Sequence, residues 1–102
     1  MLGWATGAEK LYPDIQNFEK EESFYGKEAV IKLTTEVYDW CIEATKNMDM
    51  SKAQEMVGPN ENFQFARIEW LKKSLEHQTH HRGNTTTYLR IKGIEPPASK
   101  LF

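Results

Sequence analysis

The amphipathic pattern from about Asn62 to Lys92 constrains the fold more than any other feature of this 102-residue chain. At about 100° per residue, the turn of an α-helix, the pattern carries two adjoining apolar stripes. A helix with two such stripes is usually covered by neighbours on both, so we predict a central position in a helical bundle. One stripe contains Ile68, Leu71, Leu75 and Leu89, and the other contains Phe63, Trp70, His77, His81 and Tyr88.

A second helix is predicted from Lys27 to about Asn47. Its apolar residues recur in steps of three and four, which is typical of a helix with one buried stripe. Gly26 precedes the start, and Asn47 can end the pattern. The stripe consists of Val30, Leu33, Val37, Trp40 with Cys41, Ala44 and Met48.

The connecting segments contain strong turn signals. Ser51 to Gln54 matches a capping box for a single turn, and Gly58-Pro59-Asn60 interrupts the chain. Asn60 or Asn62 can cap the long helix, and Gly93 can end it before Pro96-Pro97. Gly83, inside that helix, costs about 1 kcal/mol relative to Ala unless close packing requires it.

The N-terminal segment, from Met1 to Tyr25, carries a weaker pattern. One or two helical turns are expected between Met1 and Lys10, ended by Pro13-Asp14 and followed by a charged linker. From the two long helical patterns we predict an all-α, bundle-type fold.

Two long helices and a short N-terminal segment do not enclose a core. We therefore predict a homodimer in which two copies form a four-helix bundle. In the alternative, residues 1–25 fold back as the missing cover. The dimer is favoured because exposed apolar stripes of this size are unusual on soluble monomers.

Composition excludes several classes of protein. The net charge is −2 and no basic stripe occurs, which argues against nucleic-acid binding. The single cysteine, Cys41, allows no internal disulfide and fits a reducing cytoplasm. No apolar run approaches the roughly 20 residues of a membrane span, and the start lacks a signal-peptide pattern. We expect a cytoplasmic protein that binds neither nucleic acid nor membrane.

All three histidines lie between His77 and His81. His77 and His81 are one helical turn apart and share a face, so two neutral imidazoles can reach one transition-metal ion. In the alternative, they are a packed, hydrogen-bonded pair. A third donor could be Glu9 or a histidine of a partner chain across a two-fold axis. Gln78, Thr79 and His80 stand between the two, so the glutamate of a His-Glu-x-x-His protease is absent.

The roles of three further side chains, His80, Arg82 and Cys41, are less specific. His80 is expected off the shared face and exposed. Arg82 could clamp an anionic substrate, although a structural ion pair is favoured. Cys41 lies on the buried stripe and is expected to be an inert core thiol.

The segment LEHQTHHRGNTTTYLRIKGIEPP resembles the last helix of the DinB/YfiT-like family. Members have a His-x-x-x-His pair, an Arg-Gly after it, a Thr/Tyr/Leu run, and then Gly and Pro. The segment GKEAVIKLTTEVYDWCIEA is similar to the preceding helix of that family. The opening MLGWATGAEKLYP looks like the end of the family's second helix, so we expect the N-terminal helices to be absent.

The resemblance implies a four-helix bundle, often dimeric. It also implies a divalent metal such as nickel, zinc or iron, held by three histidines. Two of these correspond to His77 and His81, and the third belongs to the family's second helix. Some members are thiol-dependent S-transferases or isomerases that use bacillithiol- or mycothiol-like cofactors.

The predicted organisation has three parts: residues 1–25 as a helix remnant and linker, 26–97 as a DinB-like helical hairpin, and 98–102 as a tail. We predict a DinB-like helical-bundle protein that holds a divalent metal at His77 and His81, in a fold of the thiol-dependent transferase type. The alternatives are a catalytically silent dimeric scaffold, or a small-ligand-binding module with a void beside Trp70 and Tyr88.

Overall fold

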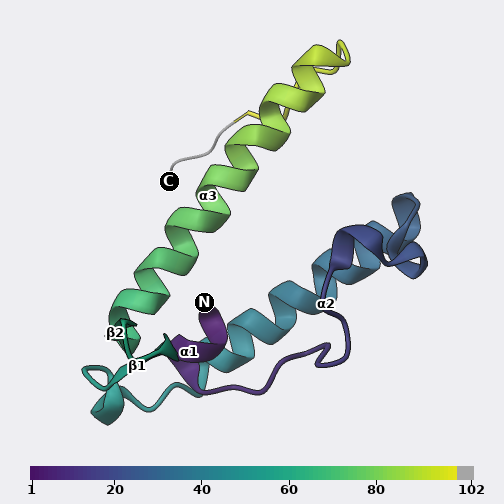
Figure 1. Ribbon diagram of the computed structural model, residues 1–102. Helices are drawn as coiled ribbons and strands as arrows, with labels where there is room; N and C mark the ends of the chain where they lie inside the picture. The colour runs from purple at the N-terminus through teal and green to yellow at the C-terminus, as the bar shows by residue number, and fades with distance from the viewer. Residues whose placement is uncertain (99–102) are drawn as a thin grey trace.

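A computed structural model describes residues 1–98 of the chain, which contain three α-helices, three short 3-10 turns and one β-hairpin (Figure 1). The strands pair antiparallel. The elements are α1 (Leu2–Thr6), η1 (Phe18–Lys20), η2 (Glu22–Phe24), α2 (Lys27–Lys46), η3 (Met50–Lys52), β1 (Met56–Asn60), β2 (Phe63–Ala66) and α3 (Arg67–Ile91).

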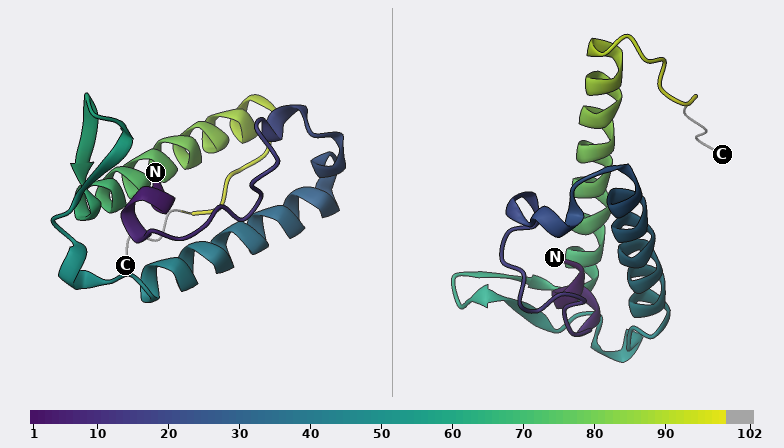
Figure 2. Two further views of the ribbon diagram at one scale, coloured as in Figure 1. Left: turned by 60° about the horizontal axis from the view of Figure 1, so that its bottom comes forward. Right: turned by 90° about the vertical axis from the view of Figure 1, so that its right-hand side faces the viewer.

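The long helices meet at one end of the molecule and diverge from it (Figure 1). The linker after α1 runs to the far end of α2, and α2 returns to the hairpin from which α3 leaves (Figures 1 and 2). The result is an open shape measuring 46 × 34 × 27 Å. In the described residues, the hydrogen bond between α2 and α3 side chains runs from Gln78 Nε2 to the Tyr38 hydroxyl, at 2.7 Å.

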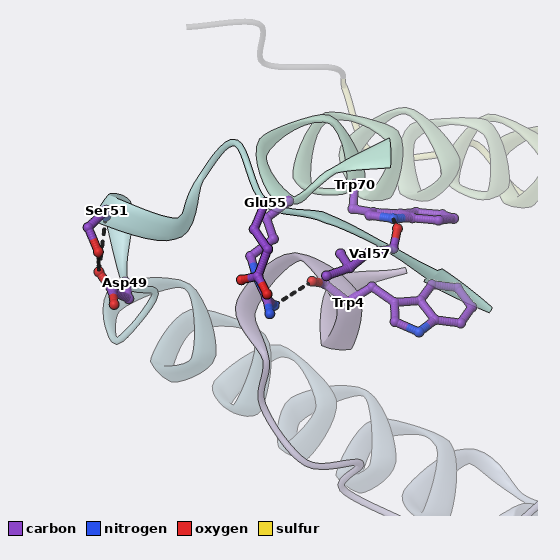
Figure 3. Close-up of polar contacts among 7 residues, drawn as sticks. Trp4, Asp49, Ser51, Glu55, Val57 and Trp70 are labelled. Carbon is purple, nitrogen blue, oxygen red and sulfur yellow. Dashed lines mark hydrogen bonds and ion pairs between the residues drawn. The ribbon is translucent and has the colours of Figure 1, made fainter. Parts of the chain in front are cut away.

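The core lies where α1, the hairpin and the start of α3 meet. Trp70 is 3% exposed, and its ring centroid is 4.7 Å from that of Trp4. Phe63 and Phe65 of β2 meet Trp70 edge-on. The Trp70 Nε1–H donates to the Val57 carbonyl at 2.7 Å (Figure 3). The buried indole therefore leaves no donor unsatisfied.

Arg67 links three segments at this end of the molecule. Its Nε donates to a Glu55 carboxylate oxygen and its Nη1 to the Trp4 carbonyl, both at 2.9 Å (Figure 3). The Arg67 N–H also donates to the Glu55 carbonyl. One side chain therefore fixes α1, the loop before β1 and the first turn of α3 relative to one another.

The protein is mostly helical, as predicted, but it is not all-α, because residues 56–66 form a hairpin. α3 begins at Arg67 rather than near Asn62, since Phe63–Ala66 pairs with β1. The alternation of Phe63 and Phe65 was a local signal for a strand. Gly58 lies where the pairing register shifts, and a Cβ there would clash with the Phe63 carbonyl oxygen. Gly58-Pro59-Asn60 is therefore part of a strand, not a break.

Helix ends agree in part with the predictions. Gly26, Asn47 and Gly93 lie at the predicted ends. Gly93 adopts φ 71° just after the C-cap of α3, a conformation that favours glycine. The predicted capping residues do not cap their helices: Ser51 does not cap η3, and the N-cap of α3 is Ala66 rather than Asn60 or Asn62. Asp49, not Ser51, accepts the N–H at the start of η3, and Asn60 accepts from Asn62 within the hairpin turn.

The N-terminal segment covers α2 incompletely. Tyr12, Phe18 and Phe24 form an aromatic cluster, and the Tyr12 hydroxyl donates to the Glu36 carboxylate on α2. α2 buries no residue fully, and α3 buries only Trp70. The four-helix bundle and the dimer therefore stay predictions. Large apolar side chains remain exposed on both helices: Val30, Ile31, Tyr38, Ile42, Leu75, Tyr88 and Ile91.

The predicted tail, 98–102, lies outside the described residues except for Ala98.

Gly83 lies inside α3, and a Cβ there would meet nothing within 4 Å. Gly83→Ala is expected to stabilise the protein by about 1 kcal/mol, because alanine loses less backbone entropy in a helix. Urea unfolding measures the change. Gly58→Ala is the control and should destabilise, since its Cβ would clash with backbone. Equal effects of the two changes would contradict the prediction.

The Arg67 hydrogen bond and charge lower the pKa of Glu55 below its usual value. The stability from this contact is therefore present above the unfolded-state pKa of about 4.3 and is lost as the pH falls through the folded-state pKa. Glu55→Gln should destabilise at neutral pH and have less effect near about pH 3. Denaturant titrations at both pH values measure this, and the same loss at both would refute it. In an Arg67→Met background, Glu55→Gln should change the free energy of unfolding by the same amount at both pH values.

Candidate metal-binding site

His77 and His81 face one another on α3 through their Nε2 atoms, which are 3.1 Å apart. The ring centroids are 4.5 Å apart and the planes are inclined at 79°. Two nitrogens at about 2.1 Å from one ion lie about 3.0 to 3.4 Å apart at octahedral or tetrahedral angles. The same distance also suits an N–H···N hydrogen bond between neutral rings. The pair is therefore arranged for either metal ligation or mutual hydrogen bonding.

Within one chain, both rings are exposed to solvent, as is His80. The expectation that the pair faces packed interior does not hold for the single chain, because no element of residues 1–98 buries this part of α3. The expected exposure of His80 is confirmed. Its Nε2 lies 3.3 Å from Asn84 Nδ2, so its polar partner is one turn further along α3.

The donor set for a metal is incomplete. In residues 1–98, no group of three or more His, Cys, Asp or Glu side chains could hold a metal ion. Glu9 therefore does not complete the pair. The three-histidine set that the family resemblance implies does not form within this part of the chain, which supplies two converging donors.

A cavity of about 930 Å³ adjoins His81 between α2 and α3. The Tyr38–Gln78 hydrogen bond lies on its wall. Trp70 and Tyr88 do not line it, so it is not the void expected beside them, and Trp70 is enclosed by Trp4 and the hairpin. The lining residues are Tyr38, Gln78, Thr79, His81, Arg82, Gly83, Thr85, Thr86, Leu89, Pro97 and Ala98.

Arg82 is the cationic side chain on the wall of this cavity. The structural ion pair predicted for it is not found among residues 1–98, where its guanidinium makes no ion pair or hydrogen bond. Thr85 and Thr86 use their hydroxyl protons on the carbonyls of His81 and Arg82. The cavity wall therefore offers an unneutralised positive charge beside a histidine.

Cys41 is half-buried on α2 rather than enclosed in a core, and this partial burial raises its pKa. A raised pKa leaves less thiolate at neutral pH, so the thiol is a poor nucleophile. Sequence reasoning missed Tyr38, which lies outside the predicted stripe of α2 and reaches α3. Its signal was a second apolar face on α2 that includes Ile31 and Ile42.

None of the helices in residues 1–98 combines the length and apolar character needed to cross a membrane.

Comparison with known proteins places the chain in a family. No curated protein and no solved structure is significantly similar to it. The profile described as "DinB family" matches residues 4–101, a range that contains α2, the hairpin, α3 and the histidine pair. Because this match covers almost the whole chain, the protein belongs to the DinB family.

Proposed function

We propose that this protein binds a divalent transition metal, such as nickel, zinc or iron, through His77 and His81. The observation that carries the proposal is the 3.1 Å separation of the two Nε2 atoms, both accessible from solvent. Imidazole nitrogen suits each of these metals. Membership of the DinB family supports a histidine pair with this role.

The cavity beside His81 supports the binding of a ligand next to the proposed metal. Its single guanidinium, Arg82, favours an anionic group, and the hydroxyl of Tyr38 can accept or donate a hydrogen bond. A bound divalent ion would supply Lewis-acid chemistry at the edge of this cavity. Through the family resemblance, the proposal extends to thiol-dependent transfer in the cytoplasm, with an external low-molecular-weight thiol rather than Cys41.

The cavity also supports a second candidate, a small-ligand-binding module without metal chemistry. Its volume is about 930 Å³, and its wall is partly apolar at Leu89 of α3 and Pro97 of the segment that follows α3. A volume of this size is large enough for a small molecule. The catalytically silent dimeric scaffold remains the alternative if neither metal nor ligand binds.

Metal binding by untagged protein tests the proposal. Chelator-stripped protein is titrated with Zn²⁺ or Ni²⁺ and followed by calorimetry and elemental analysis. His77→Ala and His81→Ala should each weaken binding at least tenfold, because each removes one of two donors. His80→Ala is the matched control and should bind as the wild type does.

All three histidines are exposed, so each variant is expected to keep the wild-type circular dichroism spectrum. Exposed substitutions of this kind usually change the free energy of unfolding by no more than about 0.5 kcal/mol. Wild-type affinity in both His77→Ala and His81→Ala would overturn the proposed metal site.

The thiol of Cys41 is expected to react slowly, since burial raises its pKa. Alkylation by iodoacetamide at neutral pH, followed by mass spectrometry, should be several-fold slower in the native protein than in urea. Adding Zn²⁺ should leave the native rate unchanged. Native alkylation as fast as in urea, or protection by the metal, would instead place Cys41 at the site.

A further inference from the structure

We propose that the cavity beside His81 binds a small carboxylic acid as its anion, held by the guanidinium of Arg82 and the hydroxyl of Tyr38. Gln78 is the positioning residue that holds Tyr38 in place. This inference rests on the ligand cavity of the proposed function and names the chemical class of its ligand. Binding of the carboxylate requires no metal ion, so the metal site and the carboxylate site can fail separately.

The charge on the cavity wall is the first argument. Among the described lining residues, Arg82 is the one Arg or Lys side chain, and none is Asp or Glu. Its guanidinium makes no ion pair within residues 1–98. The planar fork of a guanidinium matches the two oxygens of a carboxylate. The wall therefore offers one uncompensated positive charge, which one carboxylate neutralises.

The hydroxyl of Tyr38 supplies a second donor. Its oxygen accepts the N–H of Gln78 Nε2 at 2.7 Å, so the phenol proton is left for another acceptor, and it finds none within residues 1–98. Gln78 and Arg82 are four residues apart on α3, which places their side chains one helical turn from each other on one face. A carboxylate at this turn can accept hydrogen bonds from both Tyr38 and Arg82.

The threonines of the wall are left as acceptors. The hydroxyls of Thr79, Thr85 and Thr86 each donate their proton to the α3 carbonyl one turn earlier. A hydroxyl whose proton is used in this way offers a ligand only its oxygen lone pairs. These three side chains therefore do not compete for a carboxylate, and its position is set by Arg82 and Tyr38.

The rest of the wall favours a carboxylate over a phosphate. A phosphate monoester carries a charge of about −1.5 to −2 at neutral pH, which the one guanidinium of the described wall would neutralise only in part. Leu89 and Pro97 add apolar surface against which the hydrocarbon body of an acid can pack. The volume, about 930 Å³, is sufficient for an aromatic or aliphatic acid.

Binding of benzoate by EDTA-stripped, untagged protein tests the inference. Benzoate and benzamide, which has nearly the same shape but no charge, are titrated into isotope-labelled protein, and amide chemical shifts give the affinity and the position. Benzoate should shift the amides of Gly83 and Thr86 and bind at least about tenfold more tightly than benzamide, because only benzoate pairs with the guanidinium. Inorganic phosphate at the same ionic strength should bind more weakly than benzoate.

Two pairs of variants test the two donors. Arg82→Met should weaken benzoate binding at least about tenfold, because it removes the charge and keeps an unbranched side chain. Arg90→Met, at an exposed arginine of α3 outside the cavity wall, is the matched control. Tyr38→Phe should weaken binding several-fold, and Tyr88→Phe, also outside the wall, should not. All four side chains are exposed, so each variant should keep the wild-type fold, which its amide spectrum checks.

A double-mutant cycle tests the positioning role of Gln78. Gln78→Leu should weaken benzoate binding several-fold in the wild-type background, because Tyr38 loses the hydrogen bond that holds it. In a Tyr38→Phe background, the same change should have no further effect, since no hydroxyl is left to position. Equal weakening in both backgrounds would show that Gln78 does not act through Tyr38.

The outcomes separate the two proposals. Equal affinity for benzoate and benzamide, or wild-type affinity in Arg82→Met, would overturn the carboxylate site. Phosphate binding as tight as that of benzoate would overturn the assignment to carboxylates. Zn²⁺ binding without benzoate binding would overturn this inference alone, and benzoate binding without Zn²⁺ binding would overturn the metal site alone.

Discussion

The packing of Trp70 against Trp4 and the hairpin holds this molecule together. It joins α1, both strands and the first turn of α3, and the Arg67 contacts reinforce the same junction. The few buried side chains of the described residues include Ala5 and Trp70 at this end, so burial and hydrogen bonding coincide there. A core this small gives a marginal share of apolar burial for a chain of about 100 residues. The outer parts of α2 and α3 extend from it without a core of their own.

The open arrangement of the helices explains the state of the histidine pair. Because α2 and α3 diverge, the faces that a bundle would bury stay exposed, and His77 and His81 are among them (Figure 1). The same divergence leaves the cavity that Arg82 and Tyr38 line. The divergence of α2 and α3 therefore accounts for the exposed apolar side chains and for the exposure of the two histidine donors.

Membership of the DinB family and the chemistry of the site are separate findings. The family match covers residues 4–101 and is consistent with a mostly helical protein. It does not supply a third metal donor in the described residues, where none accompanies the pair. The metal-binding role proposed for the histidines therefore depends on the 3.1 Å spacing of two Nε2 atoms, which suits a shared ion as well as a hydrogen bond between the rings.

The sequence by itself determined α2, most of α3 and the alignment of His77 with His81, because helical periodicity and end signals act between residues a few positions apart. The glycines at positions 26 and 93 marked helix boundaries for the same reason. Only the tertiary structure decided that Phe63–Ala66 pairs with β1, that the histidine face is open, and that Arg82 borders a cavity. Strand pairing, exposure and cavities depend on which distant segments meet, and no local period records that choice.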